Sequence, residues 1–124
     1  MAGRLQSVLG AHFQANTSLS SEIDLGGSTL LAFELPESFN GTTLTFQARA
    51  QTTVTEVTDQ ETFKEVYDDS GTAISITVAQ NRIVVLTSTD SLAFAPLRHI
   101  KIRSGTASSP VTQQESVIKV IVKE

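Results

Sequence analysis

Two histidines are the side chains of this chain best suited to acid–base catalysis. The chain has no cysteine, which excludes a thiol nucleophile, a disulfide and a zinc–thiolate site. A serine nucleophile would need His12 or His99 as its base, and no Gly-x-Ser-x-Gly turn is present to expose such a serine. His12 lies in an N-terminal stretch with no clear strand pattern. We therefore expect no catalytic residues and a protein that is not an enzyme.

His99 belongs to a row of basic residues. Alternation along this segment places Ile100 and Ile102 inward, so that His99, Lys101 and Arg103 point outward together. Neighbouring positive groups oppose protonation of a histidine, and the row contains no carboxylate to orient it as a base. Two interpretations remain: a solvated strand face, or a basic stripe that docks an acidic neighbour.

One segment is rich in acidic residues, which are the ligands that a calcium site needs. Its carboxylates are Asp59, Glu61, Glu65, Asp68 and Asp69. The run from Asp68 to Gly71 does not have the spacing of a calcium-binding loop, and Asp and Ser in such a run are typical of a turn. We expect no metal site and no cofactor.

Two other kinds of chemistry find little support. No Gly-rich loop of the P-loop type is present, which argues against nucleotide hydrolysis. Sugar-binding clefts usually present aromatic platforms, but the chain has no tryptophan and a single tyrosine, Tyr67. The separation of paired carboxylates that defines a glycosidase cannot be read from a sequence.

Composition indicates one folded domain. With 124 residues, 40% hydrophobic and 18% charged, the chain is long enough for one core and too apolar to be disordered. A net charge of −4 argues against a nucleic-acid partner. The most apolar run, Ser116 to Val122, is far shorter than the ~20 residues of a membrane helix, and Met1 to Phe13 does not look like a signal peptide.

Period-2 alternation is the dominant pattern and predicts β-strands. Half-buried strands are expected over 19–25, 42–50 and 73–79, and further strands over 63–67 and 99–104. Gly26-Gly27 and Asn40-Gly41 are typical of the turns between them. The predicted core residues are Leu44, Phe46, Ile74, Ile76, Val78, Ile100 and Ile102. We expect an all-β, antiparallel β-sandwich over residues 18–124, more similar to a jelly roll than to an immunoglobulin domain.

Three runs are apolar on both faces: Thr29 to Leu35, Arg82 to Leu86 and Val117 to Val122. Such runs are either central strands or strands that a neighbouring subunit covers. The first interpretation is the simpler one, and the second stays open.

The N-terminal residues have a different pattern. Leu5, Val8, Leu9 and Phe13 lie at helical spacing, but Gly10 interrupts them and a helix this short is marginal alone. We expect residues 1–17 to form an arm that is either a frayed tail or becomes ordered against a neighbouring subunit.

Several segments together resemble a family of small structural proteins of tailed bacteriophages and prophages. The resemblance covers about residues 18–122. It is carried by Ser18 to Gly27, Leu35-Pro36, Leu44 to Ala48, Phe63 to Thr72 and, as its most specific part, Lys101 to Gln114.

The resemblance implies a virion protein, made in the cytoplasm of the host bacterium. A capsid cement or decoration protein fits best. Its partners would be the major capsid protein and neighbouring copies of itself, as a trimer or dimer, with no nucleic acid and no membrane. The partner-binding residues would be Leu5, Val8, Leu9, Phe13, His99, Lys101 and Arg103. The alternative is a module of the tail, baseplate or fibre that contacts other tail proteins or a host glycan.

Overall fold

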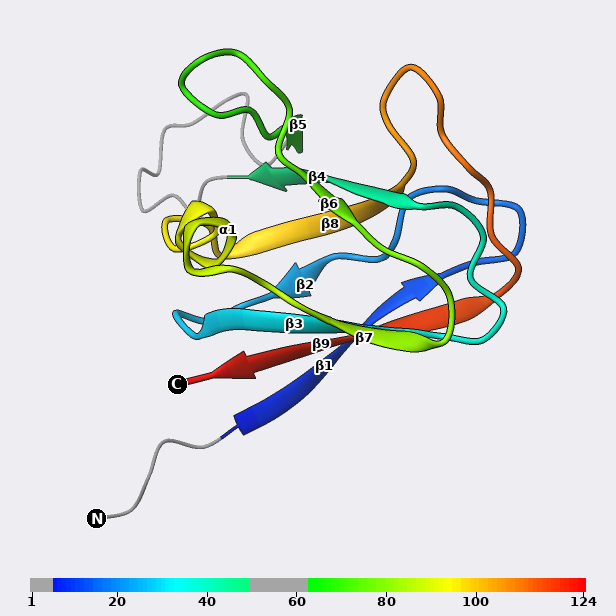
Figure 1. The fold of residues 1–124 in the computed structure, drawn as a ribbon, viewed down its shortest axis with the longest axis horizontal. Coiled ribbons are helices and arrows are strands. Elements are labelled where there is room, and N and C mark those ends of the chain that lie inside the picture. The colour runs from blue at the N-terminus through cyan, green and yellow to red at the C-terminus, as the bar shows by residue number, and fades with distance from the viewer. Residues whose placement is uncertain (1–5, 50–62) are drawn as a thin grey trace, which may run out of the picture.

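The computed structural model describes residues 6–49 and 63–124. In these residues the chain forms strands and one short helix (Figure 1). The strands are β1 (Gln6–Phe13), β2 (Ile23–Asp24), β3 (Thr29–Leu35), β4 (Thr43–Arg49), β5 (Lys64–Glu65), β6 (Ser75–Thr77), β7 (Arg82–Val85), β8 (His99–Ser104) and β9 (Ser116–Lys123). The helix is α1 (Ser88–Ala93).

The strands form two antiparallel sheets that pack face to face, which confirms the predicted β-sandwich (Figure 1). The first sheet has the order β1-β9-β3-β7, and the second has the order β2-β8-β4-β5, with β6 also paired to β4. The first four strands of the chain thus pair in turn with the later strands β9, β8, β7 and β5/β6. This wrapping is the strand order of a jelly roll.

The alternation of apolar and polar residues along the strands explains which side chains form the core between the sheets. The predicted core residues are buried in it, apart from Ile74, which is partly buried and packs against it. Three phenylalanines contributed by β3, β4 and the segment after α1 join the layers. Phe46 stacks on Phe33 with ring centroids 5.9 Å apart, and it forms a T-shaped pair with Phe94 with ring centroids 4.8 Å apart.

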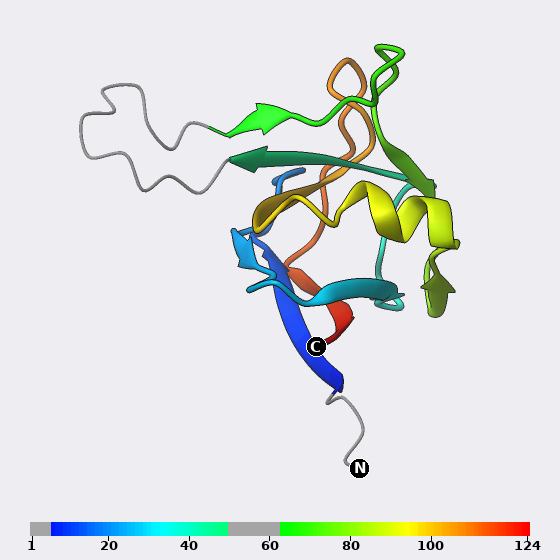
Figure 2. The ribbon, with the colours of Figure 1, turned by 90° about the vertical axis from the view of Figure 1, so that its left-hand side faces the viewer.

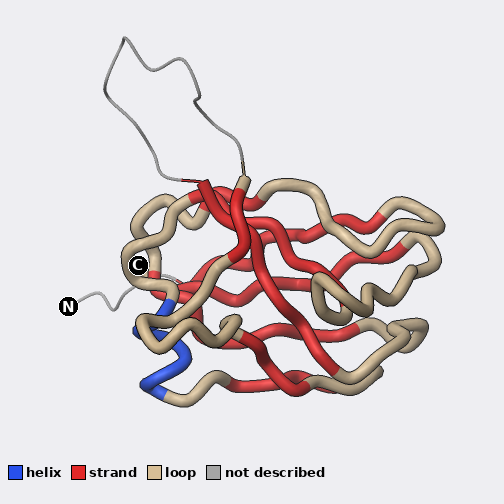
Figure 3. The backbone as a smooth tube through the Cα atoms, turned by 90° about the horizontal axis from the view of Figure 1, so that it is seen from above, coloured by secondary structure: helices blue, strands red, loops and turns tan. Residues whose placement is uncertain are grey.

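Helix α1 closes one end of the sandwich, between the two layers (Figure 2). It begins after Thr87, whose hydroxyl accepts a hydrogen bond from the N–H of Asp90, the usual N-cap contact. Its Ser91 hydroxyl donates to the carbonyl of Leu30 in β3 and so ties the helix to the first sheet. Figure 3 shows the helix at one end of the strands, viewed from above.

The N-terminal arm predicted for residues 1–17 is wrong over the described residues 6–17. Residues 6–13 form strand β1, which pairs along its whole length with β9. Leu9, Ala11 and Phe13 point inward at period 2, and Phe13 is completely buried in the core. Burial on one face of the sheet therefore prevails over the helical spacing that Leu9 and Phe13 also satisfy. Leu5 lies outside the described residues.

Candidate interaction surfaces

The predicted basic row lies on the outer face of the second sheet. His99, Lys101 and Arg103 alternate along β8 with the buried Ile100 and Ile102, as expected. The expectation of a row without carboxylates is wrong, because strands distant in the sequence bring acidic groups against it. Glu22 precedes β2 and approaches His99, and Glu65 in β5 approaches Arg103.

Arg103 and Glu65 form a bidentate ion pair across β8, β4 and β5. Arg103 Nη1 donates to Glu65 Oε1 at 2.6 Å and Nη2 donates to Oε2 at 2.5 Å. Gln47 also donates to Glu65 Oε2, at 2.8 Å. The hydrogen bonds from Arg103 hold the pKa of Glu65 below its usual value, and Glu65 in turn raises the pKa of Arg103. Arg103 is only 9% exposed, so it is neither a solvated residue nor a free charge.

The other two basic residues also have neighbours within the chain. Glu22 Oε2 lies 2.8 Å from His99 Nδ1, although this contact is poorly aligned for a hydrogen bond, and it accepts a hydrogen bond from Arg49 at 2.9 Å. The ammonium of Lys101 lies 4.6 Å from the centre of the Phe63 ring, within cation–π range. Within the row, Arg103 is thus held in an ion pair and Lys101 lies against an aromatic ring, and the role of the row as a docking contact stays a prediction.

The other predicted histidine, His12, lies beside a small cavity of about 200 Å³ that Ser20 and Ser21 also line. Its Nε2 is 3.1 Å from Glu115 Oε2. The Ser21 hydroxyl accepts a hydrogen bond from the backbone N–H of His12. The Ser20 hydroxyl accepts a hydrogen bond from the N–H of Ile102 and donates one to the carbonyl of Ser21. Both hydroxyls are therefore engaged with the backbone, where they fix the chain between β1 and β8.

The acidic segment forms the predicted turn at Asp68. Asp68 Oδ1 accepts hydrogen bonds from the Ser70 N–H, the Ser70 hydroxyl and the Thr72 N–H, at 2.8–2.9 Å. These bonds lower the pKa of Asp68, and the bond from the Thr72 N–H has the largest effect. In the described part of the chain, no three His, Cys, Asp or Glu side chains gather closely enough to hold a metal ion. Asp59 and Glu61 lie outside the described residues.

The outer face of the first sheet carries exposed aliphatic side chains around the charged cross-strand pair Glu34 and Lys119. Its outward side chains include Val8 on β1, Val117 on β9 and the pair Ile83 and Val85 on β7, which are 60%, 40%, 55% and 73% exposed. Ile121 of β9 lies among them, because it pairs with Ala32, which in turn pairs with Val85. Exposed aliphatic side chains gathered on one face are typical of interaction surfaces, so this face is a candidate interaction surface.

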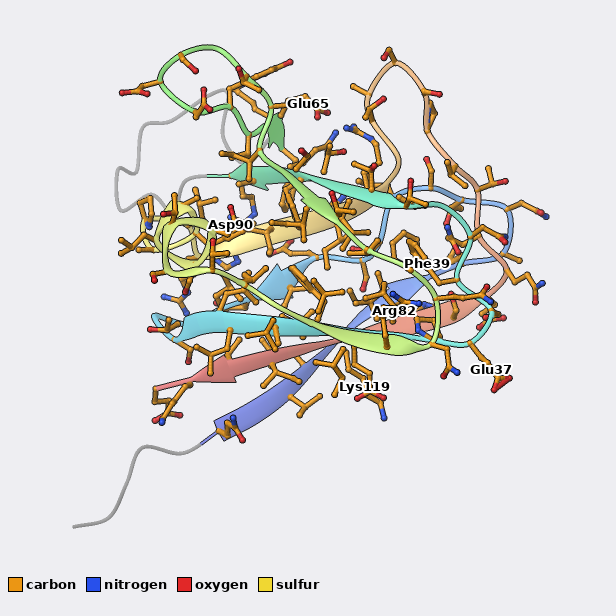
Figure 4. All side chains as sticks on the ribbon, viewed as in Figure 1. Glu37, Phe39, Glu65, Arg82, Asp90 and Lys119 are labelled. Carbon is orange, nitrogen blue, oxygen red and sulfur yellow. The ribbon has the colours of Figure 1, made fainter. Side chains whose placement is uncertain are left out.

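A groove of about 510 Å³ runs across this face. A β-bulge at Leu31, between the paired residues Leu30 and Ala32, bends β3 at this point. The groove is lined by Gln6, Leu31, Ala32, Ile83, Val85, Leu86, Thr87, Ser88, Ser91 and Ile121. Lys119 also lies on this outer side, and Figure 4 shows it on the side of the molecule opposite Glu65. We call this surface the outer face.

The structure also decides between the two interpretations of the doubly apolar runs. β3 and β9 are the central strands of the first sheet, so both of their edges are paired and their inward side chains lie in the core, whereas the outward Val117 of β9 stays exposed. β7 is an edge strand, and Ile83 and Val85 point outward from it. The sequence signal that could have revealed the outer face was therefore the Arg82 to Leu86 run.

Comparison with known proteins adds a fold relationship. No family model matches the chain, and no curated protein matches its sequence. The crystal structure of the SPBc2 prophage-derived protein YomS is similar, with a TM-score of 0.50 and 11% sequence identity over 100% of this chain and 99% of that one. At this identity the likeness shows a shared fold. Within the residues described, no helix is long and apolar enough to cross a membrane.

Proposed function

We propose that this chain is a non-enzymatic structural protein of a tailed-phage particle, which binds other virion proteins through the outer face. The observation that carries the proposal is the exposure of Val8, Ile83, Val85 and Val117 on one side of one sheet. Such a surface contributes binding free energy when a partner covers it, at about 25 cal/mol per Å² of apolar area.

The distribution of charge supports a structural role. The charged side chains that alternation places together on the second sheet are used in contacts within the chain, as in Arg103 with Glu65 and Lys101 with the Phe63 ring. The serine hydroxyls beside His12 bond to the backbone. These groups stabilise the jelly roll, whereas the outer face has no comparable partner among the described residues.

Within this proposal we favour a capsid cement protein that binds the major capsid protein. Jelly rolls recur in viral capsid proteins, and the similar fold of YomS comes from a prophage-derived protein. The resemblance of residues 18–122 to small phage structural proteins points the same way. A cement protein needs adhesive area and no chemistry, which is what the outer face provides.

Binding to particles that lack the protein tests the proposal. Replacement of Val85 by Lys would bury an unpaired ammonium in the contact and should weaken binding at least about tenfold. Tyr67→Lys is the matched control, because Tyr67 is 57% exposed but lies outside the first sheet. Co-sedimentation with the particles measures both variants. Normal binding of Val85→Lys, with a fold unchanged by circular dichroism, would refute the outer face as the contact.

A further inference from the structure

Among residues 6–49 and 63–124, nothing pairs with the first half of strand β1 along one of its edges. β1 is the terminal strand of the first sheet, and it pairs with β9 on its other edge (Figure 1). At the far end of β1, the N–H of His12 donates to the Ser21 hydroxyl and its carbonyl accepts the N–H of Ser21. The backbone of His12 therefore points away from β9. Since this direction alternates along an antiparallel strand, the N–H and C=O groups of Gln6, Val8 and Gly10 also point to the free edge.

Between Gln6 and Gly10, this edge has none of the usual protection against pairing. Natural edge strands carry charged residues, prolines or bulges that prevent another strand from adding to them. The segment from Gln6 to Gly10 is Gln-Ser-Val-Leu-Gly, without charge or proline, and its pairing with β9 is regular. The opposite edge, β7, is only four residues long and begins with the charged Arg82. The free edge of β1 is therefore the better place for strand addition.

From these features we infer that two copies of this chain pair through β1, antiparallel about a twofold axis. Ser21 blocks the edge at His12, so the pairing segment ends at Gly10. A twofold centred on Val8 pairs Val8 with its counterpart and Gln6 with Gly10 of the second copy. Each such pair exchanges two N–H···O bonds, which joins the two first sheets into one continuous sheet.

A second copy fits this edge better than a different partner for two reasons. Pairing of β1 with itself closes at two copies, whereas pairing of β1 with β7 of another copy would continue into a filament. The uncharged segment also allows close approach of two chains that each carry a net charge of −4. Antiparallel pairing of identical strands satisfies the backbone groups of both copies equally.

The dimer also has a larger surface for binding a partner than one copy has. Four strands about 4.8 Å apart and about seven residues long at 3.3 Å per residue give an outer face on the order of 400 Å². Standard protein–protein interfaces cover about 800 Å² on each partner. Two copies joined along β1 place their outer faces side by side and reach about this area. The dimer does not depend on whether the partner is a capsid or a tail protein.

Sedimentation equilibrium of the purified full chain tests the dimer. We expect a mass of twice the 13.3 kDa of the chain. The N–H of Val8 points to the free edge and makes no bond to β9. Val8→Pro removes this N–H and so one hydrogen bond to the second copy, and we expect the dimer dissociation constant to rise about tenfold or more. Val8→Lys, which adds an edge charge without changing the backbone, should act in the same direction. Val85→Lys is the matched control on the opposite edge and should leave the dimer intact.

Each result bears on the inference. A monomer at all concentrations up to about 1 mM would overturn it, as would a dimer that survives Val8→Lys. Loss of the dimer in Val85→Lys would indicate stacking of outer faces and would also overturn it. Hydrogen exchange gives a second measurement: the amides of Val8 and Gly10 should become protected as concentration rises. Failure of the dimer with normal particle binding would leave the proposed function standing.

Discussion

The ion pair between Arg103 and Glu65 should make a large contribution to stability for a pair near the surface. In Glu65→Gln, the amide can accept from one guanidinium nitrogen but presents its NH₂ group to the other. Arg103, which is 9% exposed, is then left without a counter-charge. Loss of a charge-assisted hydrogen bond costs about 1.5–3 kcal/mol, and breaking a fully buried pair costs about 3–5 kcal/mol. Because the Glu65 side chain is 27% exposed, we expect a loss of about 2–3 kcal/mol.

Urea and thermal unfolding followed by circular dichroism measure this loss. At about 4 °C per kcal/mol for a chain of this size, the melting temperature should fall by about 10 °C at pH 7. The folded pKa of Glu65 is lowered, so the stabilisation is present above its unfolded pKa of about 4.3 and is lost as the pH falls through the folded pKa. The difference between wild type and Glu65→Gln should therefore narrow at pH 3.

Asp24→Asn provides the control for this prediction. Asp24 also pairs with an arginine, Arg98, but both side chains are more than 40% exposed. Exposed pairs contribute about 0–1 kcal/mol, so this variant should unfold close to the wild type. Glu65→Gln could instead lower the free energy of unfolding by less than about 0.5 kcal/mol, or by the same amount at pH 3 and pH 7. Either result would show that the Arg103–Glu65 pair does not stabilise the fold more than an exposed pair does.

Two further predictions concern the core and a turn. Phe46→Ala removes a ring that packs on Phe33 and Phe94 and should cost about 3–5 kcal/mol in urea unfolding; a melting temperature within a degree of wild type would contradict the packing. Gly105→Ala should cost more than Gly71→Ala in the same assay. Both glycines have positive φ, but a Cβ at Gly105 would lie 2.5 Å from the Ser109 carbonyl oxygen, and one at Gly71 meets nothing within 4 Å. Equal losses would argue against the close approach at Gly105.

Alternation in the sequence predicted most of the sandwich. β3 and β8 begin and end where the apolar pattern does, because one face of each strand is buried against the other sheet. Helix α1 was missed, since six residues with one N-cap give too short a pattern. β1 was missed because Gly10 and Ala11 weaken its period-2 signal, while Leu5, Val8, Leu9 and Phe13 match a helix equally well.

The surfaces were harder to predict than the core. Alternation placed His99, Lys101 and Arg103 on one face, but it contains no strand order and so could not bring Glu22 and Glu65 to them. The apolar run of β7 suggested either a central strand or a covered one. Only the sheet order shows that β7 is an edge strand, with Ile83 and Val85 directed outward. Partners distant in the sequence therefore decide what each face can do.

The copy number of the protein in purified phage particles tests its assignment to the capsid most directly. Quantitative mass spectrometry against the major capsid protein gives this number, and a cryo-EM map of the same particles gives the position. A cement protein repeated by the symmetry of the shell should be present at on the order of hundreds of copies, with its outer face against the capsid. Three to a few dozen copies located on the tail, or absence from the particle, would contradict the capsid assignment.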